Sequence, residues 1–133
     1  HASNVLLESD VPLIYIPGYQ VAELLQLSLP AAKEWLSGRG PLAEFLLDTF
    51  RNNPINPQVE SVGRSWVLWD IIAIAWLLDP SWVPTRPVPR ARVGSDHRWQ
   101  PIDRAGATML EAYHAKRNLI FEDFFARAMD GEG

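Results

Sequence analysis

The chain has 133 residues and a mass of 15.0 kDa, the size of one globular domain. Hydrophobic residues make up 47% and charged residues 21%, which excludes disordered and fibrous classes. The net charge of -4 argues against a protein that coats nucleic acid or an anionic membrane, and no cysteine is present for a disulfide or a thiolate metal site. No apolar run is long enough for a membrane helix and no leader is visible, so we expect a cytoplasmic protein.

The first elements begin almost at once, although the chain starts at His1 rather than at a methionine. The apolar residues Val5–Leu7 predict the end of a helix. Val11–Ile16 is nearly all apolar and is closed by the turn pair Pro17-Gly18, which predicts a strand buried on both faces in a parallel sheet.

Helical spacing dominates the next forty residues. It predicts a helix over 21–28 and a second helix that begins near Pro30 and ends near Gly38. A third helix follows over 42–50, with its core-facing stripe at Leu42, Phe45, Leu46 and Thr49.

The second half opens with a polar, proline-containing loop over 52–65 and continues into the most apolar stretch, WVLWDIIAIAWLLDP, which ends at Asp79-Pro80. Three prolines between residues 83 and 93 exclude a helix and favour an edge strand. Short strands are expected over 97–102 and 110–114. The remaining expectations are a helix over 121–128 after a cap at Asn118, and a frayed end at 131–133. Interleaved helices and short apolar strands indicate an α/β class.

Asp70 is the residue that most needs an explanation. It is the only charged side chain between Ser65 and Leu78, near the start of a helix that is apolar nearly all round. Such a helix is expected to be buried, and a buried carboxylate costs several kcal/mol unless it has a partner. That partner could be the helix start or an arginine such as Arg64. Alternatively, Asp70 could bind a metal or a substrate, and hard cations such as calcium prefer carboxylate oxygens.

Tryptophan is the second unusual feature, with six in the chain. Trp66, Trp69 and Trp76 surround Asp70, and Trp82 follows. Helical spacing assigns Trp76 and Trp82 to the core, whereas Trp69 could instead stack on a nucleobase or a sugar.

Other candidate groups give weaker signals. His97 and His114 lack metal-ligand spacing. The arginines between 86 and 104 could reach a phosphate, but a solvated edge explains them more simply.

Three stretches resemble the C-terminal part of the inosine-uridine nucleoside hydrolases. They are ASNVLLESDVPLIYIPGYQV, SWVLWDIIAIAWLLDPSWV and the closing helix NLIFEDFFARAM, and they occur in the family's order. The resemblance implies one C-terminal portion over 1–133 of an open, mostly parallel sheet flanked by helices. It also implies hydrolysis of the N-glycosidic bond of ribonucleosides to ribose and a free base.

The resemblance implies a cofactor and two site residues as well. Family members hold a calcium ion in an aspartate cluster, and the metal lowers the pKa of a bound water that attacks the anomeric carbon. The family's calcium-binding and ribose-contacting aspartate matches Asp70. Trp69 stands where the family usually has a histidine, a proposed proton donor, and could stack on the base instead.

The family's N-terminal DxDxxxDD signature has no match in this sequence. The resemblance therefore implies a C-terminal fragment that is inactive alone, whose partners are a ribonucleoside substrate, the missing N-terminal half and, through a bare sheet edge, further copies of itself. No catalytic residue is assigned to this portion. The alternative is a non-catalytic binding module on the same fold that has lost the metal site.

Overall fold

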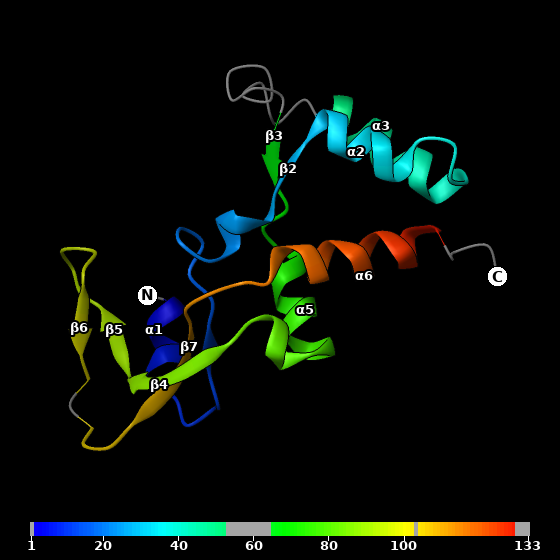
Figure 1. Ribbon diagram of the computed structural model, residues 1–133. Coiled ribbons are helices and arrows are strands. Elements are labelled where there is room, and N and C mark those ends of the chain that lie inside the picture. The colour runs from blue at the N-terminus through cyan, green and yellow to red at the C-terminus, as the bar shows by residue number, and fades with distance from the viewer. Residues whose placement is uncertain (1, 53–64, 103, 130–133) are drawn as a thin grey trace.

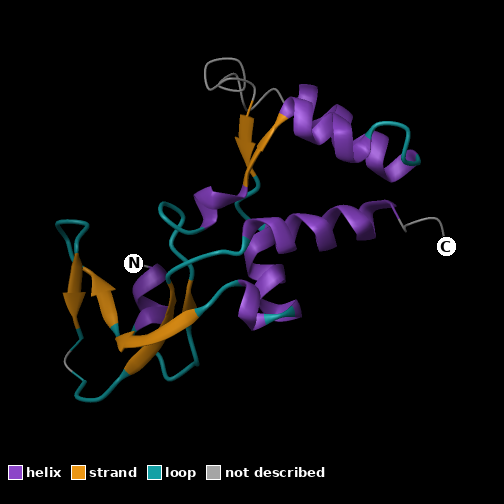
Figure 2. Cartoon of the chain, in the orientation of Figure 1, coloured by secondary structure: helices purple, strands orange, loops and turns teal. Residues whose placement is uncertain are grey.

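The computed structural model describes residues 2–52, 65–102 and 104–129 (Figure 1). The helices are α1 (Ala2–Leu7), α2 (Leu29–Leu36), α3 (Pro41–Asn52), α5 (Ile71–Leu78) and α6 (Arg117–Met129), with short 3₁₀ helices at Ala22–Leu25 and Pro80–Trp82. The strands are β1 (Ile14–Tyr15), β2 (Gln26–Ser28), β3 (Ser65–Val67), β4 (Thr85–Pro89), β5 (Ala91–Val93), β6 (Trp99–Pro101) and β7 (Thr108–Ala112) (Figure 2). The expected α/β class is confirmed.

The largest described sheet has the strand order β1-β7-β4. β1 pairs with β7 in parallel, and β4 pairs with β7 in the antiparallel direction. This sheet is therefore small and mixed, and the described strands do not show a mostly parallel sheet. This sheet lies with α1 and the hairpin β5–β6 at one end of the molecule, while α2, α3, α5 and α6 gather at the other (Figure 1).

The expected buried strand over 11–16 is reduced to β1, and the expectation of burial on both faces is wrong for this chain. Val11 and Ile14 are exposed, and β1 is an edge strand whose only neighbour among the described strands is β7. The parallel direction is confirmed by the register Ile14↔Leu110. An exposed apolar edge is a surface on which further chain can pair.

The helix expected over 21–28 is also wrong. The structure has the 3₁₀ turn Ala22–Leu25 followed by strand β2, which pairs antiparallel with β3 in the register Leu27↔Trp66. Leu25 and Leu27 are fully buried on either side of exposed Gln26, which is the period of a strand. The tertiary pairing with β3 outweighs the local helical spacing.

The helices α2 and α3 are confirmed. The hydroxyl of Ser28 accepts a hydrogen bond from the backbone N–H of Ala31 at 3.3 Å, and Pro30 occupies the first turn of α2, where its missing N–H costs nothing. In α3 the expected stripe is partly wrong, because Ala43 and Leu47 are buried while Leu42 and Phe45 are exposed. The buried stripe is rotated from the predicted one.

The core lies between the 3₁₀ turn, β2 and the helices, and Phe125 of α6 is at its centre with no exposed surface. The ring of Trp35 from α2 stacks on it, with 5.0 Å between the ring centroids. Trp76 and Trp82 pack partly buried against the same cluster, as expected.

The helix α6 begins at Arg117, so the expected cap at Asn118 is wrong. The guanidinium of Arg117 donates to the carbonyl oxygen of Gln26 at 2.9 and 3.2 Å and lies 4.5 Å from the ring centroid of Phe121. These contacts fix the start of the helix against β2. The strands expected around residues 83–93, 97–102 and 110–114 correspond to β4, β5, β6 and β7. The loop at 53–64 and the terminus at 130–133 lie outside the described residues.

A buried arginine holds the segment after α1 against the sheet. Arg90 is only 6% exposed, and its guanidinium donates to the backbone carbonyl oxygens of Ser9, Val11 and Thr108. The carbonyl dipoles replace the water that this cation has lost, and the cation satisfies three acceptors in return.

We expect Arg90→Met to lower the free energy of unfolding by about 2–3 kcal/mol, because it removes charge-assisted hydrogen bonds and leaves carbonyl groups unpaired. The matched control is Arg92→Met, since Arg92 is half exposed and lies 3.9 Å from Glu8. This control should change the free energy by less than about 0.5 kcal/mol. Urea unfolding measures both, and equal effects would show that Arg90 has no special structural role.

Candidate functional site

Asp70 is the residue immediately before α5, at the junction between β3 and the helix. Its carboxylate makes no capping hydrogen bond, and no described residue forms an ion pair with it. The side chain is exposed, so the expectation of burial is wrong. The suggested partner Arg64 lies outside the described residues.

Asp70 is exposed, contrary to expectation, and the helix that follows it is itself only partly covered. α5 buries Ile72 and Ala75, but Ile74 and Leu78 are exposed and Leu77 is 73% exposed. A helix that is apolar nearly all round therefore presents an open apolar face in this chain. Such faces on soluble proteins are interaction sites.

Trp69 is 39% exposed and lies beside an aromatic neighbour that the sequence argument did not single out. The ring of Tyr19 contacts it edge to face, with 6.1 Å between the centroids and 75° between the planes. The only sequence signal for Tyr19 was its place just after the Pro17-Gly18 turn. Nothing in the sequence indicates which tryptophan it contacts.

The described residues do not by themselves form a metal site. Within them, no group of three or more histidine, aspartate or glutamate side chains is close enough together to hold a metal ion. Asp70 therefore offers one carboxylate, whereas calcium takes six to eight oxygen ligands. His97 is exposed in the turn between β5 and β6, where its φ is 60°, whereas His114 comes shortly after the end of β7.

The described arginines from 86 to 104 are largely committed to structural contacts. Arg86 forms an ion pair with Glu111 at 2.8 Å, Arg90 binds backbone carbonyls, and Arg104 pairs with Asp10. On α6, the carboxylate of Asp123 raises the pKa of Arg127 through hydrogen bonds and charge. These pairings explain the basic stretch as structural.

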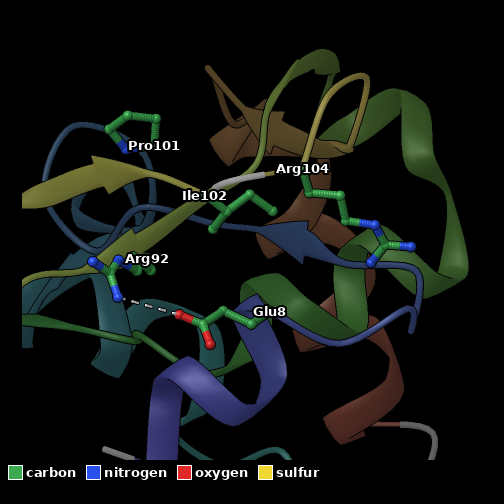
Figure 3. A pocket seen from close by; sticks show the side chains of 5 residues that line it. All are labelled: Glu8, Arg92, Pro101, Ile102 and Arg104. Carbon is green, nitrogen blue, oxygen red and sulfur yellow. Dashed lines mark ion pairs between the residues drawn. The ribbon is translucent and has the colours of Figure 1, made fainter.

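A cavity of about 410 Å³ opens beside this arginine-rich segment, lined by Glu8, Arg92, Pro101, Ile102 and Arg104 (Figure 3). Arg92 points toward Glu8, and Ile102 lies between Arg92 and Arg104. Each of these guanidinium groups has a carboxylate near it, Glu8 for Arg92 and Asp10 for Arg104. The cavity does not include Trp69 or Asp70.

Comparisons with known proteins identify the fold. No family model matches the sequence, and no curated protein matches it. Among solved structures, the chain is similar to a purine-preferring ribonucleoside hydrolase from Gardnerella vaginalis, with a TM-score of 0.77, 21% sequence identity and coverage of 97% of this chain. The chain spans 43% of the length of that hydrolase. It therefore has the fold of part of a ribonucleoside hydrolase, as the resemblance implied.

The lengths and compositions of the described helices bear on whether any of them could span a membrane. None of those in residues 2–52, 65–102 and 104–129 is both long and apolar enough to cross a bilayer.

Proposed function

We propose that this chain is part of an enzyme that hydrolyses the N-glycosidic bond of ribonucleosides and releases ribose and a free base. The fold similarity over 97% of the chain is the observation that carries the proposal. The arrangement at the start of α5 is compatible with it, because an exposed carboxylate at Asp70 stands next to an exposed indole at Trp69. A nucleoside has a polar sugar and a planar base that match these two groups.

In this proposal Asp70 binds both the calcium ion and the ribose. Its carboxylate is uncommitted among the described residues, so its oxygens are available to a cation and to the hydroxyl groups of a sugar. When bound, the metal supplies a water of lowered pKa as the nucleophile. The further ligands have to come from residues outside the described part of this chain, because it offers no metal-binding cluster.

Trp69 is proposed to hold the base by stacking. Its indole N–H does not release a proton at physiological pH, so Trp69 cannot protonate the departing base. Stacking requires ring surface that a base can reach, and Trp69 is 39% exposed. A two-ring base offers the larger stacking area, and the similar hydrolase is described as purine-preferring. We therefore propose purine nucleosides as the favoured class.

The enzyme of this proposal needs more chain than these residues. The similar hydrolase is more than twice as long, and the apolar face of α5 and the edge strand β1 are open here. We propose that the remaining part of the fold covers both surfaces and supplies the other site residues. The chain alone is then inactive and associates through the same surfaces with further copies of itself.

A substitution on α5 tests whether this face is covered in the complete protein. Leu77→Gln is expected to lower the free energy of unfolding of the complete protein by about 2–3 kcal/mol, although Leu77 is 73% exposed in this chain. The exposed residue Lys33 of α2 provides a control, and Lys33→Gln should have almost no effect. If urea unfolding shows no loss for Leu77→Gln, the face is open to solvent and the covering proposal is wrong.

The function itself is tested with the protein encoded by the complete reading frame. Release of base from inosine and uridine is measured with calcium, with a chelator, and with calcium restored. Hydrolysis that stops with the chelator and recovers with calcium supports the proposal. Binding of nucleoside without hydrolysis and without calcium binding would instead support a non-catalytic binding module on the same fold.

A further inference from the structure

Tyr19 is the most exposed aromatic contact of Trp69 in the described structure and has no role in the core. Tyr19 is 79% exposed, yet its ring contacts Trp69 edge to face, with 75° between the two ring planes. Two perpendicular rings form a corner. A planar ligand can stack on the face of one ring while its edge contacts the face of the other.

The backbone of the turn keeps Tyr19 in this place. Gly18 lies beside the indole, and a Cβ added to it would make an ordinary van der Waals contact, 3.8 Å from Cζ3 of Trp69. Gln20 has a φ of 78°, in the left-handed region that a residue with a side chain rarely adopts, and its N–H donates to the Glu23 carboxylate at 2.5 Å. Strained turns of this kind cluster at ligand sites.

The position of the turn in the sheet points in the same direction. Tyr19 follows the carboxyl end of β1, which runs parallel to β7. Ligands of open α/β sheets bind outside the carboxyl ends of parallel strands. Asp70 follows Trp69 directly in the chain, so the residue proposed to bind the ribose is next to the aromatic corner.

We infer that Tyr19 forms, with Trp69, the corner that receives the nucleobase, and that Tyr19 is the residue that favours a two-ring base over a one-ring base. This inference rests on the proposed function and extends it to a residue outside the tryptophan-aspartate pair. A purine reaches both rings because its second ring extends the stacked area, whereas a pyrimidine on Trp69 loses much of the contact with Tyr19.

The test compares variants of the complete protein with inosine and uridine as substrates. Tyr19→Ala should raise KM for inosine about 5- to 10-fold, raise KM for uridine less than twofold, and leave kcat within twofold. The base contact is the same in the ground and transition states, so KM changes and kcat does not. Tyr19→Phe should restore the KM for inosine, because the ring and not the hydroxyl makes the contact.

The matched control is Trp99→Ala. Trp99 also forms an edge-to-face pair, with 5.4 Å between its ring centroid and that of Tyr15, but it lies on β6. It should leave both KM values unchanged. We expect Tyr19→Ala to fold, because Tyr19 is exposed in the wild-type chain, and thermal unfolding of the variant checks this.

The outcomes separate this inference from the function on which it rests. If the protein hydrolyses nucleosides but Tyr19→Ala leaves both KM values unchanged, or raises them equally, the inference is overturned and the function stands. If no hydrolysis occurs, the function fails, and inosine binding is followed by tryptophan fluorescence. A dissociation constant that Tyr19→Ala raises 5-fold or more still supports the corner, and no binding or an unchanged constant overturns it.

Discussion

Under the proposed function, replacing Asp70 with asparagine in the complete protein is expected to weaken calcium binding and to lower kcat/KM for nucleosides, each by roughly 100-fold or more. The amide retains an oxygen but loses the negative charge that a hard cation prefers. The fold should not suffer, because the Asp70 carboxylate makes no capping hydrogen bond and no ion pair with a described residue. Calorimetric titration with calcium and steady-state kinetics measure the two effects.

The other end of α5 provides the control for this substitution. Asp79 is also an aspartate at a helix boundary, but its carboxylate accepts a hydrogen bond from the N–H of Ser81 at 2.8 Å. Asp79→Asn should cost at most about 1 kcal/mol of stability and leave calcium affinity unchanged. Equal calcium affinity in wild type and Asp70→Asn would contradict the proposal that Asp70 is a metal ligand.

Phe125→Ala should cause the largest loss of stability, about 3–5 kcal/mol in the free energy of unfolding. Phe125 has no exposed surface and contacts the rings of Trp35, Phe121 and Phe124. Removing its ring leaves a cavity that three large neighbours cannot fill without leaving their own positions. Urea unfolding followed by tryptophan fluorescence measures the change and also reports on Trp35.

Phe45 of α3 serves as the comparison, because it is an exposed phenylalanine on a helix of the same group. Phe45→Ala should change the stability of this chain by less than about 0.5 kcal/mol. A loss at Phe125 no larger than the loss at Phe45 would mean that the core is not organised around α6.

The helices α2, α3 and α6 could be located from the sequence because their signals are local. A serine and a proline mark the start of α2, and apolar spacing marks the other two. The strands β4 and β7 were also located from proline positions and alternation. The exposed stripe of α3 shows the limit of this reasoning: spacing defines an apolar face, but the neighbouring helix decides which part of it is covered.

The candidate site could be predicted only in part. The isolated charge in an apolar run identified Asp70, yet its exposure could not be foreseen, because the apolar run gives no information on whether this chain contains the elements that cover it. Tyr19 and Trp69 come from distant segments, and their contact depends on the turn after β1. Residues 26–28 form the strand β2 where a helix was predicted, and this likewise depends on pairing with β3, which is far away in the sequence.

The parallel pair β1–β7 has a consequence for how the molecule is made. β1 lies near the beginning of the chain and β7 near its end, so this pairing closes a loop that contains nearly all the other elements. During synthesis on the ribosome, β7 therefore emerges long after β1. The entropic cost of closing so long a loop makes the pairing of the two strands slow. The core around Phe125 is also completed late, because α6 follows β7 in the chain. The apolar segment at β1 therefore stays without its β7 partner while most of the chain emerges.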